Sequence, residues 1–224
     1  MRNTLIAALF LAIPLTPALA AEQLDGKATY DLLFREHTLD DVEPGQTLTY
    51  TRAVSNTLNP AAAERDSGQI EMSFDKERAL MAVLELKRED DKHRGLGRFP
   101  ASVGNPMIMF FYESVVRDMA ESAGGSPFYI RNRVKDSLVK SSEVIAGEAE
   151  VDGKVIPTQS VTLRPFENDP NADRMKGFDE LELEVVMSDE VPGWYVSLTA
   201  SVPGEGKAPT YLSEIDFRAL EAAQ

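Results

Sequence analysis

Short segments in which apolar and polar residues alternate dominate this chain, and the alternation constrains its fold more than any other feature. Ile70, Met72 and Phe74, for example, are separated by Glu71 and Ser73. A period of two places successive side chains on opposite faces of a β-strand, so that one face is buried. The pattern predicts about nine or ten strands, and the segments that carry it are 28–35, 47–54, 69–75, 79–87, 128–134, 155–163, 180–187, 194–202 and 210–218.

Clusters of turn-forming residues separate many of these segments. Pro44-Gly45, Gly124-Gly125-Ser126-Pro127 and Pro203-Gly204-Glu205-Gly206 are the clearest. Short strands at this spacing favour a mainly β fold with a curved antiparallel sheet, as an open or half barrel or as a sandwich. No repeat and no shift in composition divides the sequence, so we expect residues 21–224 to form a single β-rich domain.

One segment, residues 105–123, follows a helical pattern instead. Asn105 is a good helix cap, and Pro106 fits the first turn of a helix. Gly124-Gly125 provides the end of the helix. We therefore expect one central apolar helix that acts as a plug or lid on the sheet. Weaker patterns predict a second helical stretch at 59–66 and a terminal turn at 217–223.

The first turn of this predicted helix is apolar on every side, from Met107 to Phe111. It either plugs the mouth of the sheet as ordinary core or lines an adaptable apolar pocket, because unbranched methionine side chains repack around varied ligands. Phe111 falls on the main helical stripe and is expected in the core, whereas Met107 and Phe110 fall off it. The candidate pocket residues are Met107, Ile108, Phe110, Phe111 and Trp194.

The first twenty residues have the order of a signal peptide. Arg2 precedes an apolar run at 5–13, and Ala18-Leu19-Ala20 supplies the small-x-small pattern of a cleavage site. The run is too short to span a bilayer as a helix, and no later segment is long enough. We expect cleavage after Ala20, export to a periplasm, and a protein that is not integral to the membrane.

Charge and composition exclude several functional classes. The chain has 37 acidic and 23 basic side chains, a net charge of −14, and no cysteine. A strongly acidic protein lacks the basic face that a nucleic-acid backbone requires, so we expect no nucleic-acid partner. The absence of cysteine excludes thiol redox chemistry and disulfide bonds.

No sequence motif for a catalytic, metal or cofactor site stands out. His37 and His93 lie in polar turns outside any metal-binding motif. Residues 169–180 place oxygen ligands at calcium-loop positions, but Arg174 occupies the sixth position, where the loop requires glycine, so we predict a solvated turn. We therefore expect no catalytic residue, no metal and no cofactor, although 37 acids leave a catalytic carboxylate pair open.

The export signal, the number of strands and the apolar helix at 105–123 together resemble the periplasmic lipoprotein-carrier family and its uncharacterised periplasmic relatives. The resemblance implies an apolar half-barrel that holds acyl chains. It favours a non-enzymatic envelope protein that binds a lipid or another apolar ligand and serves envelope maintenance or transport. One alternative is an envelope interaction or assembly module, whose exposed sheet edges recruit a protein partner. A carboxylate-dependent hydrolase is a second alternative.

Overall fold

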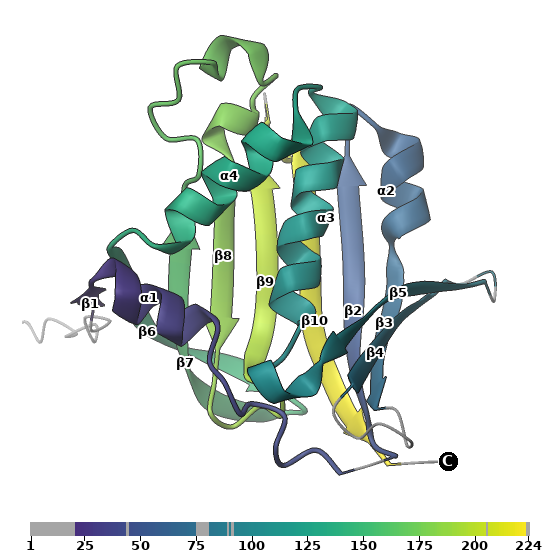
Figure 1. The fold of residues 1–224 in the computed structure, drawn as a ribbon. Coiled ribbons are helices and arrows are strands. Elements are labelled where there is room, and N and C mark those ends of the chain that lie inside the picture. Colours follow the sequence, from purple (N-terminus) through teal and green to yellow (C-terminus); the bar gives the residue numbers. More distant parts are fainter. Residues whose placement is uncertain are drawn as a thin grey trace, which may run out of the picture.

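A single ten-stranded sheet, antiparallel throughout, forms the frame of the molecule (Figure 1). The computed structural model describes residues 21–43, 45–74, 81–88, 90, 92–204 and 206–222. From one edge to the other, the strands are β1 (Ala21–Leu24), β6 (Ser142–Val151), β7 (Lys154–Leu163), β8 (Glu182–Met187), β9 (Tyr195–Val202), β10 (Tyr211–Glu221), β2 (Thr47–Asn56), β3 (Gly68–Phe74), β4 (Met81–Lys87) and β5 (His93–Pro100).

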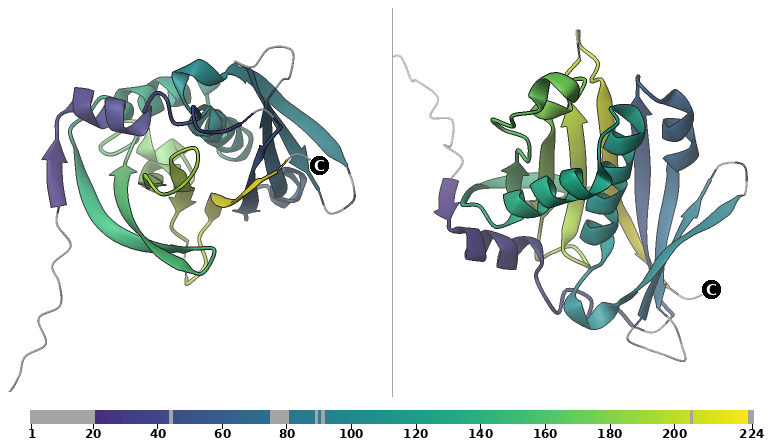
Figure 2. Two further views of the ribbon diagram at one scale, coloured as in Figure 1. Left: turned by 90° about the horizontal axis from the view of Figure 1, so that it is seen from below. Right: turned by 45° about the horizontal axis from the view of Figure 1, so that its top comes forward.

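The sheet is strongly curved and open, with β1 and β5 at its two edges. Seen from below, its strands bend around the helices on the concave side (Figure 2). The expected mainly β fold with a curved antiparallel sheet and a central helix is confirmed. The long pairing of β10 with β2, from Tyr211 opposite Asn56 to Glu221 opposite Thr47, joins its two halves and contains a bulge after Phe217.

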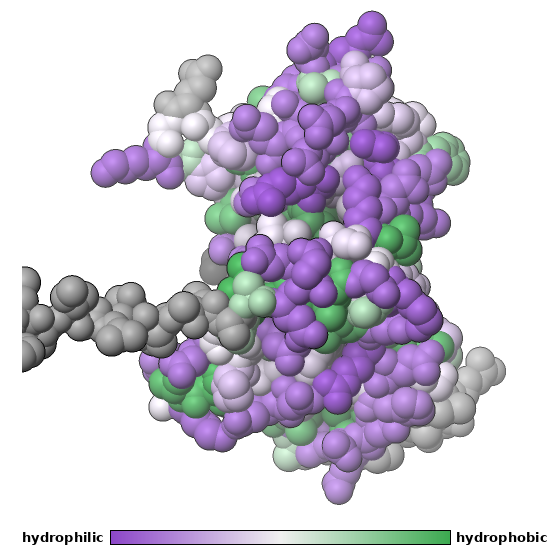
Figure 3. Space-filling model, turned by 90° about the vertical axis from the view of Figure 1, so that its left-hand side faces the viewer, coloured by the Kyte–Doolittle hydropathy of each residue, from purple (hydrophilic) through white to green (hydrophobic). Residues whose placement is uncertain are grey.

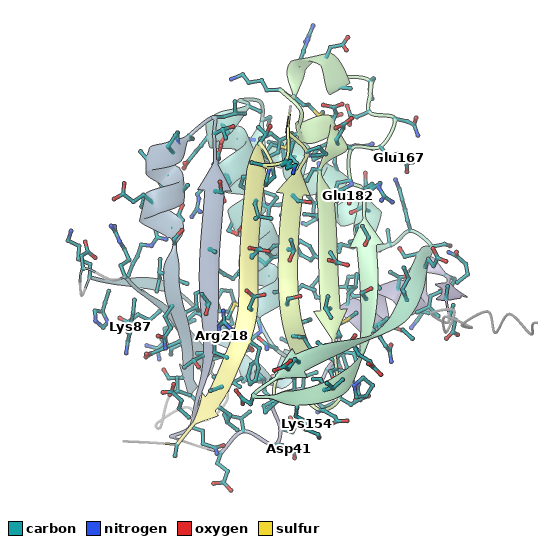
Figure 4. All side chains as sticks on the ribbon, turned by 180° about the vertical axis from the view of Figure 1, so that it is seen from behind. Asp41, Lys87, Lys154, Glu167, Glu182 and Arg218 are labelled. Carbon is teal, nitrogen blue, oxygen red and sulfur yellow. The ribbon has the colours of Figure 1, made fainter. Side chains whose placement is uncertain are left out.

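The two faces of the sheet differ in polarity, as the alternation predicts. In β8, Leu183 and Val185 are fully buried on the concave side, while Glu182 and Glu184 point outward. Seen from behind, the outer face presents its side chains with no helix in front of β8, β9, β10 and β2 (Figure 4). Burial of the apolar face against the helices stabilises the curved sheet.

The described residues form four α-helices beside the sheet: α1 (Gly26–Leu33), α2 (Pro60–Asp66), α3 (Met107–Ser122) and α4 (Pro127–Leu138). Helix α3 lies along the concave face, in front of β10 and β9 (Figure 1). Helices α4 and α1 continue this layer, and α2 packs on β2. The helices expected at 105–123 and 59–66 are thus confirmed, and the Asn59 side chain caps α2 by accepting a hydrogen bond from the Ala62 N–H. Short 3-10 turns lie at Ala101–Val103, Ala172–Arg174 and Phe178–Glu180.

Two predicted strands, 28–35 and 128–134, are wrong, because both segments are helical. In each, apolar residues four apart satisfy the helical period as well as the period of two. Tyr30 and Phe34 stack at 4.6 Å between ring centroids, and Ile130 and Val134 are both buried. Asp25, whose side chain accepts a hydrogen bond from the Ala28 N–H at 2.8 Å, begins the first helix.

The terminal turn predicted at 217–223 is also wrong, because β10 continues to Glu221. Strands β1, β5 and β6 were not predicted. In β6 most side chains beyond Val144 are at least partly exposed, and β5 contains Gly95 and Gly97, so neither segment has a strong apolar contrast. Strands of this kind, at or next to the edge of the sheet, are defined by their neighbours more than by their own sequence.

Residues 1–20 lie outside the described residues, so the signal peptide and its cleavage stay predictions. Within the described ranges, no helix is both long and apolar enough to cross a membrane.

Candidate functional site

All five candidate pocket residues are buried in one core. Met107 and Phe111 have no exposed surface, Ile108 and Trp194 have 1% and 4%, and Phe110 has 9%. Four of them lie on the first turns of α3, and Trp194 comes directly before β9. Their role as ligand contacts stays a prediction.

Asn105 holds the start of α3 against the sheet. Its Oδ1 accepts a hydrogen bond from the Met107 N–H at 2.9 Å, although Pro106 occupies the capping position itself. Its Nδ2 donates to the Tyr50 hydroxyl at 2.9 Å and to the Gly193 carbonyl at 2.7 Å. The apolar first turn of α3 is therefore fixed between β2 and the turn that leads to Trp194.

Trp194 is fastened to α1 and the segment that follows it. Its indole N–H donates to the Leu32 carbonyl at 3.2 Å, and the Arg35 guanidinium carbon lies 4.3 Å from the ring centroid. Trp194 therefore packs between the core and α1. Phe110 contacts a different side chain.

The partner of Phe110 is Arg52, an arginine on the concave face of β2. Its side chain has no exposed surface, and its guanidinium carbon lies 4.9 Å from the centroid of the Phe110 ring. Across the sheet it sits opposite Ile215 of β10. Among the described residues, none of its three guanidinium nitrogens has a hydrogen-bond partner. A buried cation without hydrogen bonds is costly, so Arg52 requires an explanation.

The nearest carboxylate to Arg52 is that of Asp118 on α3. Oδ2 of Asp118 lies 3.8 Å from Nη2 of Arg52, which is beyond hydrogen-bond distance. Asp118 has closer partners, because it accepts from the Tyr211 hydroxyl at 2.9 Å and from Nη2 of Arg117 at 2.8 Å. Burial lowers the pKa of Arg52, while the charge of Asp118 opposes the change, and a guanidinium stays charged nonetheless.

A second carboxylate, that of Asp66 at the end of α2, is fully buried and is bound by three arginines. It accepts hydrogen bonds from Arg65 at 2.8 Å, from Arg94 at 2.6 Å and from Arg117 at 2.9 Å. Burial by itself would raise the pKa of Asp66, but the hydrogen bonds from Arg65 and Arg94 and the charge of Arg117 hold it below the usual range. Asp66 thereby ties α2, β5 and α3 together.

These groups form one arginine cluster between α3 and the β2–β5 half of the sheet. Its seven members are Arg52, Arg65, Arg94, Arg117, Asp66, Asp118 and Glu121. Among the described residues, four guanidinium groups face three carboxylates, so this cluster has one surplus positive charge in a protein of net charge −14. Arg52 is the member with the weakest pairing, and it is also the most deeply buried of the four arginines.

The apolar part of the interior is rich in methionine. Five of the eight methionines in the chain are buried in the core, at 5% exposure or less: Met72, Met107, Met119, Met175 and Met187. Methionine fills irregular space and adapts to changes in its surroundings. The interior beneath α3 thus combines adaptable apolar side chains with one poorly paired cation.

Open grooves on the surface lie elsewhere. One, of about 550 Å³, runs along β2 and is lined by Arg52, Lys87 and Arg88, among others. Another, of about 430 Å³, separates α3 from α4 and includes Arg117. Neither is lined by any of the five candidate pocket residues, so a ligand that reaches them must displace side chains of the core.

In the structure, the first residue of the calcium-like loop at 169–180 contacts helix α4. The Asp169 side chain has no exposed surface, lies 2.9 Å from Nε of Arg133, and accepts hydrogen bonds from the Tyr129 hydroxyl at 2.7 and 2.8 Å. Its oxygens therefore bind α4. Within the part of the chain that the structure describes, no three His, Asp or Glu side chains come together as a metal site.

Glu214 and Asp216, on the outer face of β10, are two partly buried carboxylates on the same face of one strand. Burial raises the pKa of both, and the charge of Asp216 adds to the rise at Glu214. They flank the inward-facing Ile215, so they lie on the side of the sheet opposite to the arginine cluster. Neither residue lines the grooves described above.

Sequence reasoning missed Arg52, Asp66 and Asp118, although a signal for Arg52 was present. In the predicted strand at 47–54, Arg52 shares the face of Leu48 and Tyr50, both apolar and both buried. A charge at an inward position of a strand is uncommon. For Asp118 the corresponding signal is its place on the same helical stripe as Phe111 and Val115.

No protein-family model and no curated protein sequence matches the chain. Among solved structures, the chain is similar to lipoprotein LppX of Mycobacterium tuberculosis, with 8% sequence identity and a TM-score of 0.35. The similarity covers 87% of this chain and 96% of that one. A match this loose is a weak resemblance of folds and transfers no ligand to this chain.

Proposed function

We propose that this chain is an exported, non-enzymatic protein of the cell envelope that binds a lipid or another apolar ligand between α3 and the concave face of the sheet. The observation that carries the proposal is the construction of this interior. One helix with an apolar first turn on all sides covers the apolar concave face of an open, curved sheet, and five methionines are buried in the core that the helix and the sheet share with the neighbouring loops.

The fold offers a way for this interior to open. Helix α3 belongs to none of the strand pairings, so side chains rather than a continuous ladder hold it on the sheet. Gly124 and Gly125 follow the helix at φ of 82° and 95°, in open space. Glycine tolerates such backbone angles, and a small displacement of α3 would separate Met107, Phe110 and Phe111 from the concave face.

Among the described residues, the face of the molecule drawn in Figure 3 has no large apolar patch that could serve as a protein interface, and this favours a ligand site in the interior. There, hydrophobic residues form small, separate patches among hydrophilic ones. Scattered patches of this kind are ordinary on soluble proteins.

Uptake of the neutral fluorescent probe phenylnaphthylamine, combined with urea unfolding, tests the proposal. Phe111→Ala removes a fully buried ring and should cost about 3–5 kcal/mol of unfolding free energy. Phe110 is the least buried of the five candidate pocket residues, at 9% exposure, and if its surroundings take up the ligand, Phe110→Ala should cost much less and should weaken probe uptake. If Phe110→Ala destabilises the protein as much as Phe111→Ala, and neither the variants nor the wild type bind the probe, the interior is permanent core. An envelope interaction module would then be the better assignment.

The natural ligand can be sought directly. Protein purified from its own periplasm should carry a solvent-extractable apolar molecule in native mass spectrometry. A protein that co-purifies in its place would favour the interaction module.

A further inference from the structure

We infer that the Arg52 guanidinium anchors an anionic oxygen group, a carboxylate or a phosphate, at the head of the ligand. The ligand would then be an anionic amphiphile, with its chain among the apolar side chains beneath α3. The inference rests on the proposed function and narrows the class of ligand.

The first support is the unused hydrogen-bonding capacity of Arg52. A guanidinium has five N–H donors in a planar fork, and no acceptor in the described residues takes any of them. Two parallel bonds to a carboxylate or a phosphate match this fork, and such charge-assisted bonds are strong when they are buried. An anionic head group would supply what the chain itself does not.

The second support is the distribution of charge. Asp118, the nearest carboxylate, already accepts hydrogen bonds from Tyr211 and Arg117 and stands 3.8 Å from Arg52. The arginine cluster as a whole has one guanidinium more than it has carboxylates. One added negative charge would balance the cluster, whereas a cationic or neutral head would leave Arg52 unpaired.

The third support is the position of Phe110. Its ring lies against the Arg52 guanidinium, and it is the most exposed of the five candidate pocket residues. A turn of this one side chain would uncover the face of the Arg52 guanidinium that the ring now occupies. The ring and an incoming anion occupy alternative places against the same cation, because the face of an aromatic ring is itself a weak acceptor for a guanidinium.

Competition against bound phenylnaphthylamine tests the inference in the unmodified protein. Palmitate and methyl palmitate have the same chain and differ in the charge of the head. The affinity for palmitate, measured by displacement of the probe, should be at least about tenfold higher than the affinity for methyl palmitate. This is the scale expected for a buried charge-assisted hydrogen bond. Acetate and inorganic phosphate should displace little, because they lack the chain. Displacement by inorganic phosphate as tight as by palmitate would instead identify a site for a free anion and overturn the amphiphile.

Variants then assign the selectivity to Arg52. Arg52→Met should abolish the preference for palmitate over its ester and leave the affinity for the neutral probe within about twofold. Since Arg52 makes no hydrogen bonds within the described structure, Arg52→Met should also unfold at an unchanged or higher urea concentration. Arg131→Gln, which removes an exposed cation paired with Glu113 on α3, is the matched control and should keep the preference.

The outcomes separate the two proposals. No probe binding in the wild type rejects the proposed function, and the anchor with it. Probe binding with equal affinity for palmitate and its ester rejects the anchor alone. Strong destabilisation by Arg52→Met, with the palmitate preference retained at low temperature, would make Arg52 a structural partner of Asp118 and overturn the inference.

Discussion

Replacement of Asp66 by asparagine tests whether this buried carboxylate joins α3 to the rest of the fold. The side chain is fully buried and accepts hydrogen bonds from arginines on α2, β5 and α3. Asp66→Asn keeps the shape, removes the charge, and points an NH2 donor at guanidinium donors. We expect a large loss of unfolding free energy for a single substitution.

The magnitude follows from the exposure of the partners. Loss of one member of a buried ion pair costs about 3–5 kcal/mol, because the remaining charge stays buried. Here the three arginine side chains remain 35–43% exposed, so water can solvate them after the change. This reduces the expected loss to about 2–4 kcal/mol near neutral pH.

The loss should depend on pH in a defined direction. The pKa of Asp66 lies below its usual value in the folded protein, so the carboxylate stabilises the fold above the unfolded pKa of about 4. As the pH falls below about 4 and through the folded pKa, wild-type Asp66 becomes protonated and the contribution disappears. The stability difference between wild type and Asp66→Asn should therefore be constant from about pH 5 to 7 and should shrink below about pH 4.

Urea unfolding followed by fluorescence of Trp194, the single tryptophan, gives the loss of unfolding free energy and its dependence on pH. Asp90→Asn is the control, since Asp90 makes a more exposed ion pair with Lys92 and should leave stability nearly unchanged. A loss below about 1 kcal/mol for Asp66→Asn at neutral pH, or a difference that persists unchanged in acid, would refute the account of this cluster.

Two further predictions concern the N-terminal cleavage site and the loop at 169–180. N-terminal sequencing of protein from its native host should begin at Ala21, and a start at Met1 would contradict export through the pattern Ala18-Leu19-Ala20. Thermal melts with calcium and with a chelator should coincide, because Asp169 is occupied by Tyr129 and Arg133. A rise of several degrees with calcium would show that the loop at 169–180 binds the ion.

The class of fold could be read from the sequence because it depends on local patterns. Alternating segments such as 181–187 bury one face whatever they pair with, and the strand forms where the pattern places it. The helix that begins beyond Asn105 likewise has a polar residue before it that accepts from the Met107 N–H, its own apolar stripe and a glycine pair after its end. These features need no knowledge of the rest of the chain.

The segments 28–35 and 128–134 show where local patterns become ambiguous. Their apolar residues satisfy two periods at once, so the choice between strand and helix depends on the surrounding structure. Ser126-Pro127, at the start of α4, was the one local sign of a helix there. Tertiary packing on the concave face decided both segments.

The candidate site was likewise determined partly by local sequence patterns and partly by the tertiary structure. The sequence by itself placed Phe110 and Phe111 on one helix and residues 47–54 on a strand, because both are matters of local periodicity, but it did not single out Arg52. Only the tertiary structure decided that Arg52 lies under Phe110, 3.8 Å from Asp118, with no acceptor of its own among the described residues. Whether a buried charge is satisfied depends on atoms distant in sequence, and Asp118 is 66 residues away from Arg52.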